Sequence, residues 1–168
     1  VISLFFFFFV YSCHVFDLST HLHSLMDAKE KLIIYHTFPW IMTNDCDTPI
    51  PNGTLAQNGS GKLNDITPRL LKSLSDLGVN CIWLTGVIEN ATKTAFPGIP
   101  ADNPNVVKGE AGSPYAIKDY YDVAPAIAVD IENRMAEFES TVKRIHDSGL
   151  KVIIDFVPNH TARVYHSD

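Results

Sequence analysis

The sequence predicts an α/β protein with a parallel sheet, and three observations lead to this fold class. Short apolar segments rich in β-branched residues alternate along the chain with two segments of helical periodicity. Each helical segment runs into the next strand through a short turn with a single glycine, Gly78 or Gly149. The first and second strands are instead followed by long polar connections. Alternating strands and helices form parallel sheets with right-handed crossovers, so we expect the strands to be parallel.

The first strand is predicted at 31–38, KLIIYHTF, because this run is apolar and rich in β-branched and aromatic residues. The stretch 39–61 is rich in Pro, Asn, Asp and Gly and is predicted to be a loop. A helix is expected to begin at Thr67, since a threonine hydroxyl caps a helix and the following Pro68 suits its first turn. Its apolar positions are Ile66, Leu70, Leu74 and Leu77, and it is expected to end at Gly78.

The second strand is predicted at 80–85, NCIWLT, and Trp83 and Leu84 are expected in the core. A second long loop is predicted at 86–129, which contains five prolines. The third strand is predicted at 151–157, KVIIDFV, and strands this apolar are expected to be covered on both faces. A helix is predicted between this loop and the third strand, with Asp130 as its cap and Gly149 at its end. Its apolar stripe consists of Ile131, Met135, Phe138, Val142 and Ile145.

Composition places the chain among globular proteins of one domain. Its length of 168 residues is enough for one domain with one sizeable core. Its residues are 46% hydrophobic and 19% charged, which is typical of globular and not of disordered chains. The formal net charge is −6 and no block of Lys or Arg occurs, which argues against a nucleic acid partner. The three cysteines are widely spaced without a C-x-x-C pair, which argues against a disulfide framework or a zinc site.

The segment 1–25 differs from the rest of the chain and is predicted to be a hydrophobic leader. Its apolar run, VISLFFFFFVY, is too short to span a bilayer, which takes about 20 residues. Two interpretations stay open: a truncated signal peptide for secretion, or a mistranslated segment upstream of a true start at Met26. VYSC, ending at Cys13, loosely resembles a lipoprotein cleavage site, so membrane attachment is expected only through a lipoprotein or signal leader. An exported location is favoured, whereas a start at Met26 would favour the cytoplasm.

Function is expected at the carboxyl ends of the strands. In parallel α/β folds ligands bind at that edge, and the long polar connections leave it here. A dinucleotide- or phosphate-binding fold would need a glycine-rich turn after the first strand, but PWIMTN follows, without G-x-G-x-x-G or G-K-[ST]. A (β/α)8 barrel is therefore the main candidate for the fold.

The strongest motif is DFVPNH, residues 155–160, at the end of the third predicted strand. Pro158 cannot donate to a sheet, so pairing is expected to stop near it, and Asp155, Asn159 and His160 reach the same rim. A carboxylate, an amide oxygen and an imidazole can bind sugar hydroxyls, and the amide oxygen also suits calcium. The alternative interpretation is an ordinary turn at a strand end.

DFVPNH resembles the first conserved segment of the alpha-amylase family of glycoside hydrolases, an Asp-x-x-x-Asn-His motif on the third barrel strand. GSPYAIKDYYDVAP, at 112–125, resembles the segment before the family's second helix, and we expect its Tyr120 and Tyr121 to pack within the loop. IIYHTFPW resembles the first strand, and PNGTLAQNGSGKLNDI resembles the entry to the first helix. The resemblance implies that 26–168 is the amino-terminal part of a catalytic (β/α)8 TIM barrel, with its first three strands and first two helices only.

The resemblance also implies a role for individual residues. Tyr115 matches the tyrosine that stacks on the sugar ring next to the scissile bond, and His160 matches a histidine that hydrogen-bonds hydroxyls of that ring. Asp155 matches an aspartate that orients its neighbours in the substrate-binding site, and Asp119 matches a structural aspartate. Asn159 matches a calcium ligand in members with a structural calcium ion, which makes calcium the implied cofactor.

The resemblance implies a retaining reaction on an α-glucan or malto-oligosaccharide, with one carboxylate as nucleophile and another as acid. In the family these groups come from the fourth, fifth and seventh strands. No catalytic residue is therefore expected in this chain, and the chain alone is expected to be an inactive fragment. A transglycosylase, a sucrose-active enzyme or an isomerase of the family stays open, as does a non-catalytic sugar-binding or transporter-associated member. An unrelated barrel with phosphate substrates is disfavoured, because no glycine-rich phosphate loop occurs.

Overall fold

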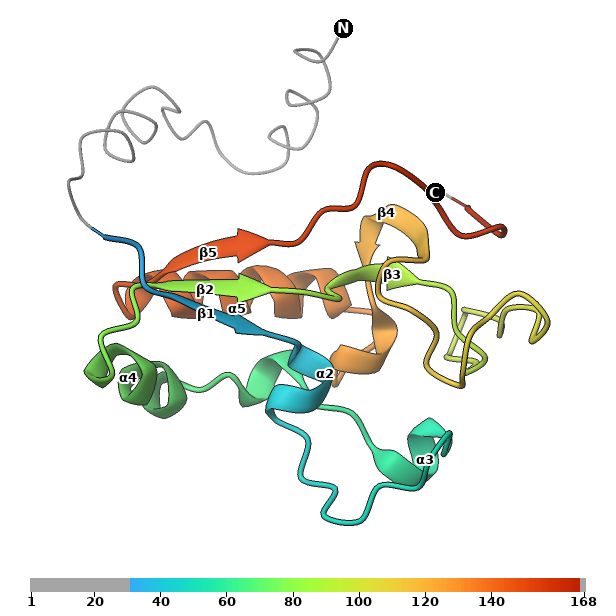
Figure 1. The fold of residues 1–168 in the computed structure, drawn as a ribbon, viewed down its shortest axis with the longest axis horizontal. Coiled ribbons are helices and arrows are strands. Elements are labelled where there is room, and N and C mark those ends of the chain that lie inside the picture. Colours follow the sequence, from blue (N-terminus) through green and yellow to red (C-terminus); the bar gives the residue numbers. More distant parts are fainter. Residues whose placement is uncertain (1–30, 167–168) are drawn as a thin grey trace, which may run out of the picture. The chain divides into compact units, whose positions relative to one another are not determined.

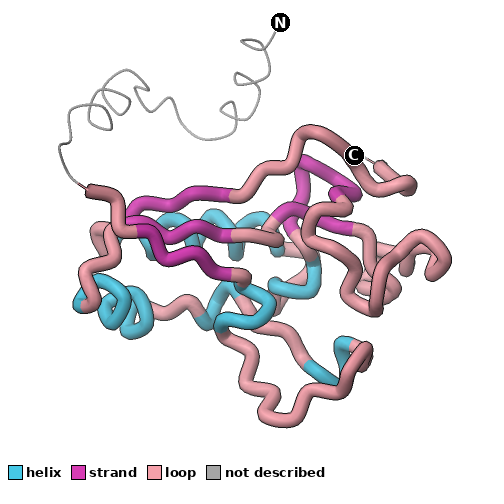
Figure 2. Tube along the Cα trace, viewed as in Figure 1, coloured by secondary structure: helices cyan, strands magenta, loops and turns pink. Residues whose placement is uncertain are grey.

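The computed structural model describes residues 31–166 (Figure 1). The predicted leader at 1–25, with the cleavage-site resemblance at Cys13, lies outside the described residues. Within 31–166, the strands of two small sheets are joined by helices and long connections (Figure 2). Every helix of this part of the chain falls short of the length or the hydropathy that a bilayer crossing requires.

Three strands form the parallel sheet that the sequence predicts. They are β1 (Ile34–Thr37), β2 (Cys81–Leu84) and β5 (Lys151–Ile154), and β2 lies between the other two. Both neighbours run parallel to β2, as the arrows in Figure 1 show. The three carboxyl ends therefore meet at one edge of this sheet, which confirms that the strands are parallel, as predicted.

The first long helix, α4 (Pro68–Asp76), begins where the sequence predicts. Thr67 is its N-cap, and the Thr67 hydroxyl oxygen accepts a hydrogen bond from the N–H of Leu70 at 3.3 Å. The predicted apolar stripe is partly wrong, because the helix buries Leu71 and Leu74 whereas Leu77 is 79% exposed. At 3.6 residues per turn, Leu77 lies about 120° around the helix axis from Leu71, so it falls outside the face that Leu71 and Leu74 bury.

The second long helix, α5 (Arg134–Asp147), begins after the predicted cap. Its N-cap residue is Asn133, not Asp130. The Asp130 carboxylate instead accepts hydrogen bonds from the N–H groups of Glu132 and Asn133, so it closes the turn that precedes the helix. Of the predicted stripe, Ile145 is fully buried, whereas Met135 in the first turn is exposed. Gly149 follows the helix with φ of +77°, as predicted.

The two predicted loops contain regular structure that the sequence pattern does not reveal. Within 86–129, β3 (Ile88–Asn90) pairs antiparallel with β4 (Ile117–Val123), with irregularities in the register. β3 has three residues, and the prolines between β3 and β4 favour a loop prediction, so neither strand stands out in the sequence. The other short elements are α2 (Pro39–Met42), α3 (Leu55–Asn58), η2 (Leu63–Asp65) and η3 (Pro125–Ile127).

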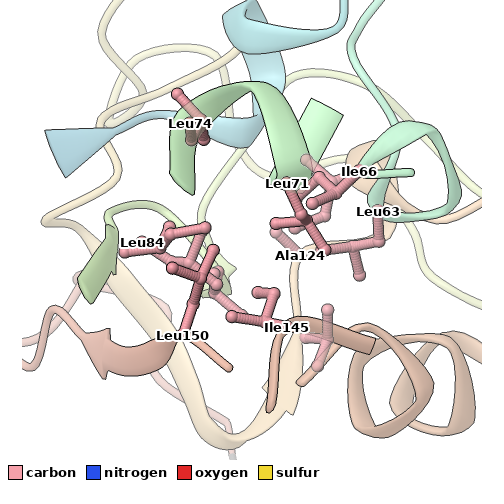
Figure 3. Close-up of a cluster of buried hydrophobic side chains, with 12 residues drawn as sticks. Leu63, Ile66, Leu71, Leu74, Leu84, Ala124, Ile145 and Leu150 are labelled. Carbon is pink, nitrogen blue, oxygen red and sulfur yellow. The ribbon is translucent and has the colours of Figure 1, made fainter. Parts of the chain in front are cut away.

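The hydrophobic core lies between one face of the parallel sheet and the helices, and Figure 3 shows its side chains. Ile82 and Leu84 of β2 are completely buried in it, which confirms the prediction for Leu84. Full burial of one such side chain contributes about 2 kcal/mol to stability. The helices and connections supply Leu63, Ile66, Leu71, Leu74, Ala124, Ile145 and Leu150 to the same cluster.

The opposite face of the parallel sheet is more open. Side chains alternate along a strand, so Trp83 points away from Ile82 and Leu84. Trp83 was expected in the core, but it is 36% exposed, and Ile34 of β1 is exposed as well. The prediction that both faces are covered is therefore wrong for the described residues, because the core cluster joins α4 and α5 to the face that carries Ile82 and Leu84.

Side chains of α5 hold the η2 turn through its backbone carbonyls. The Arg144 Nη1 donates to the carbonyl oxygens of Leu63 at 3.3 Å and Ile66 at 3.0 Å. The hydroxyl of the buried Thr141 lies 3.2 Å from the same Leu63 oxygen. Because Leu63 and Ile66 are buried, these carbonyls depend on protein donors for their hydrogen bonds.

We expect Arg144→Met to lower the free energy of unfolding by about 2 kcal/mol, because it leaves buried carbonyls without a charged donor. Lys143→Met is the matched control, since Lys143 is the exposed neighbour, whose ion pair within residues 31–166 is with Asp147 across one helical turn. That pair contributes about 0.3 kcal/mol. Urea unfolding followed by circular dichroism measures both variants, and equal effects of the two substitutions would contradict this account of η2.

Candidate functional site

Three polar side chains from three strands join at the carboxyl edge of the parallel sheet. The His36 Nε2 lies 2.7 Å from the Thr85 Oγ1, and the Thr85 hydroxyl donates to the Asp155 Oδ2 at 3.0 Å. His36 belongs to β1, Thr85 follows β2, and Asp155 follows β5. A continuous hydrogen-bonded chain therefore crosses the sheet at the edge where the sequence predicts a site.

Backbone pairing sets the level of these side chains. The N–H of Thr85 donates to the Thr37 oxygen at 3.0 Å, and the N–H of Asp155 donates to the Leu84 oxygen at 2.9 Å. The parallel ladder thus continues one residue beyond the assigned strands. Thr85 and Asp155 consequently lie side by side, with both side chains on the face that also carries Trp83.

The turn after Thr85 is held tightly against the first strand. Gly86 has φ of +75°, and a Cβ atom on it would lie 2.1 Å from the Phe38 ring, so only glycine fits here. The indole N–H of Trp40 donates to the Gly86 carbonyl oxygen at 2.9 Å. These contacts restrain the backbone that carries the Thr85 hydroxyl.

The segment after β5 is anchored by one tyrosine of β4. The Tyr120 hydroxyl lies 2.5 Å from the Val157 oxygen and 3.1 Å from the His160 oxygen. The Tyr120 ring also packs against Phe156 and Tyr165, with ring centroids 5.2 and 5.9 Å away. Burial raises the pKa of Tyr120, as does the nearby Tyr165, so its hydroxyl stays a hydrogen-bond donor. Tyr120 therefore packs against the segment after β5, as expected of a structural tyrosine, whereas Tyr121, for which packing was also expected, is 58% exposed.

Asn159 and His160 lie next to each other on the surface of this segment. Both are exposed, and the His160 Nδ1 contacts the Asn159 Oδ1. Calcium takes six to eight oxygen ligands. Within 31–166 no group of three or more His, Cys, Asp or Glu residues could hold a metal ion. The role of Asn159 as a calcium ligand stays a prediction.

Tyr115 lies in the turn before β4 and is 44% exposed. Its backbone N–H is 3.3 Å from the Ser113 Oγ, while no hydrogen bond or ring contact joins its side chain to Asp155 or His160 within the described residues. The two stretches are nevertheless neighbours, because the N–H of Ala162 donates to the Ile117 oxygen at 2.7 Å. The strand that follows Tyr115 therefore runs beside the segment that follows His160.

Charged side chains are buried at the second sheet. The Lys118 Nζ lies 3.7 Å from the Glu89 Oε1 and 3.4 Å from the Asp102 Oδ1. Glu89 is 6% exposed, and burial raises the pKa of its carboxyl, an effect that the Lys118 charge opposes. Asp119, expected to be structural, is also buried, and its carboxylate accepts the N–H of Tyr121 at 2.8 Å. Such depth and a lysine partner suit structural ions better than groups that meet a substrate.

The sequence pattern does not single out His36 and Thr85 as site residues. Both are polar residues near the carboxyl end of an apolar strand, in YHTF and IWLT. Asp155 in KVIID has the same position at the end of an apolar strand, and it was predicted as a site residue because it also begins the DFVPNH motif. A polar residue at the end of an apolar strand is the feature that could have identified His36 and Thr85 as well.

The known proteins to which this chain is similar share one catalytic-domain family. The model of the alpha-amylase catalytic domain matches residues 42–167. An alpha-glucosidase of Apis mellifera is 31% identical over 136 residues, which are 81% of this chain and 18% of that protein. The amino acid transporter heavy chain SLC3A1 of Mus musculus is 30% identical over 106 residues, 63% of this chain and 12% of that protein.

Among solved structures, an alpha-amylase from Lactobacillus plantarum has a TM-score of 0.54 and 27% sequence identity. That similarity covers 80% of this chain and 24% of the other. The chain thus spans a quarter or less of the length of these three proteins. The family match covers most of the residues that the structure describes, including the DFVPNH motif. We conclude that this chain belongs to the alpha-amylase family of glycoside hydrolases, as the resemblance in its sequence indicates.

Proposed function

We propose that residues 26–168 are the amino-terminal part of a catalytic (β/α)8 barrel in an enzyme that acts on α-glucans or malto-oligosaccharides. The observation that carries this proposal is the match of the alpha-amylase catalytic domain to 42–167. Three successive parallel strands with helices packed on one face, β1-β2-β5, are consistent with the wall of such a barrel. Polar side chains at the carboxyl ends of these strands support a site at that edge.

In this proposal three residues of the chain meet the sugar. Tyr115 presents an exposed aromatic ring, which suits stacking on the apolar face of a sugar ring. His160 presents an exposed imidazole that can exchange hydrogen bonds with sugar hydroxyls. Asp155 supplies a carboxylate that Thr85 already orients. The two carboxyl groups of the retaining reaction come from strands outside residues 1–168.

One relative supports a second candidate function, that of a transporter-associated member of the family. SLC3A1 is an amino acid transporter heavy chain, and it matches this chain over 106 residues. A transglycosylase or an isomerase is the other alternative, because the residues of this chain do not distinguish one glycosyl reaction from another. The DNA that follows the codon for Asp168 separates an enzyme from a non-catalytic member. An Arg-x-Asp on the next strand and a Glu on the one after would support an enzyme, whereas their replacement would support the non-catalytic member.

The proposal includes export from the cytoplasm, because the apolar run within 1–25 has the length of a signal-peptide core. Its partner is a sugar polymer or oligosaccharide, and membrane attachment would come only through the leader. Fractionation of cells that produce the natural gene product, followed by immunodetection, tests this part. Recovery in the cytoplasm alone would favour the start at Met26.

We expect the full chain, residues 1–168, to release no reducing sugar from starch above the buffer background. The physical reason is that a retaining reaction needs two carboxyl groups about 5.5 Å apart, and the proposal places both on other strands. A reducing-end assay at high protein concentration measures this. Hydrolysis by the wild-type chain that Asp155→Asn abolishes would show instead that the chain carries its own catalytic carboxylate.

We expect Tyr115→Ala to weaken maltoheptaose binding to the full chain about fivefold, because an aromatic contact contributes about 1 kcal/mol. Tyr115→Phe keeps the ring and is expected to retain binding. Tyr121→Ala is the matched control, since Tyr121 is also an exposed tyrosine and lies six residues further along the same region. Titration followed by NMR or calorimetry measures the affinities. An equal loss in Tyr115→Ala and Tyr121→Ala would remove the stacking role.

A further inference from the structure

The hydrogen-bonded chain of His36, Thr85 and Asp155 has a direction. A hydroxyl carries one proton, and the Thr85 hydroxyl donates that proton to the Asp155 Oδ2 at 3.0 Å. The Thr85 Oγ1 can then only accept from the His36 Nε2, which lies 2.7 Å away. The His36 Nε2 therefore carries a proton, and both hydrogen bonds point toward the Asp155 carboxylate.

One oxygen of the Asp155 carboxylate, Oδ2, is therefore occupied by a hydrogen bond, whereas the other, Oδ1, is available to accept one. The Oδ2 is held by Thr85, and the backbone N–H of Asp155 is held by the Leu84 oxygen. The Oδ1 has no hydrogen-bond partner within the described residues, and Asp155 is only partly buried. An acceptor oxygen with a fixed position and a free lone pair is suited to receive a hydroxyl donor from a ligand.

His36 is exposed, and two neighbouring side chains restrain its ring. It stands in an apolar strand after Ile34 and Tyr35, and its ring meets the Trp83 ring at 5.1 Å with an angle of 48°. The indole restrains the plane of the imidazole from one side. The Thr85 hydroxyl restrains it at the Nε2. The ring is therefore held in the orientation that passes its hydrogen bond to Thr85.

We propose that His36 is a positioning residue, which acts through Thr85 to hold the Asp155 Oδ1 toward a hydroxyl group of the sugar. The identity of the ligand as a sugar rests on the proposed function. The positioning of Asp155 by His36 and Thr85 does not, since it follows from the contacts alone. His36 itself does not touch the sugar in this proposal.

Two measurements on the full chain test the proposal. The first is the side-chain rotamer of Asp155, read from NMR scalar couplings without any sugar. We expect one rotamer in the wild type, in Thr85→Ser and in His36→Gln, because serine keeps the hydroxyl and glutamine keeps a side-chain N–H donor. We expect averaged rotamers in Thr85→Val and His36→Phe, which have similar volumes but lack these donors. The two donor-deleting variants change different strands, so loss of folding in one leaves the other as the test.

The second measurement is the affinity for maltoheptaose in a double-mutant cycle. We expect His36→Phe to weaken binding about tenfold and His36→Gln to change it less than twofold, as for a hydrogen bond in a chain that ends on a charged group. In an Asp155→Ala background, His36→Phe is expected to have no further effect.

Each result has a defined meaning. A fixed Asp155 rotamer in both His36→Phe and Thr85→Val would overturn the positioning role. An equal loss of affinity from His36→Phe with and without Asp155 would overturn it as well, because His36 would then contact the sugar directly. Averaged rotamers in the donor-deleting variants, combined with a wild-type chain that binds no maltoheptaose, would uphold the positioning of Asp155 and reject the sugar ligand of the proposed function.

Discussion

The in-register pairing of β2 with a parallel strand on each side is the constraint on which the rest of the structure depends. Ile82 and Leu84 fix this register, because a slip by one residue would turn both side chains out of the core and bring Trp83 in. The polar edge follows from the register. Thr85 can reach His36 on one side and Asp155 on the other only while all three strands end at the same level.

The long connections depend on side chains for the hydrogen bonds that a sheet would otherwise supply. The Lys62 Nζ donates to the Ala126 oxygen at 2.6 Å, and burial lowers the pKa of this lysine, while nearby carboxylates oppose that effect. Arg144 serves η2 in the same way, and Tyr120 serves the segment after β5. Each such bond contributes about 1 kcal/mol net, but an unpaired buried carbonyl costs more. Irregular backbone can therefore surround the edge of the sheet without losing order.

At the second sheet, buried charged side chains are likewise paired with other side chains of the protein. Lys118 lies between Glu89 and Asp102, and the Arg134 guanidinium of α5 contacts the Asp122 carboxylate of β4. Desolvation offsets much of the attraction in buried pairs, so their net contribution to stability is small. Their geometric effect is larger, because the Arg134–Asp122 pair ties β4 to the helix that also covers the parallel sheet.

Local pattern in the sequence determined the three parallel strands, the Thr67 cap, the glycine that follows each long helix, the family and the edge of the sheet that carries DFVPNH. Each of these depends on residues close together in the chain, through period, cap or turn chemistry. Only the tertiary structure decided the β3–β4 pairing, the exposure of Trp83 and the partners of Asp155. Thr85 meets His36 across 49 residues and Asp155 across 70, and no short-range pattern encodes a hydrogen bond of that separation. The hydrogen-bonding capacity of each side chain could therefore be predicted from the sequence, whereas its partner was set by the register of the sheet.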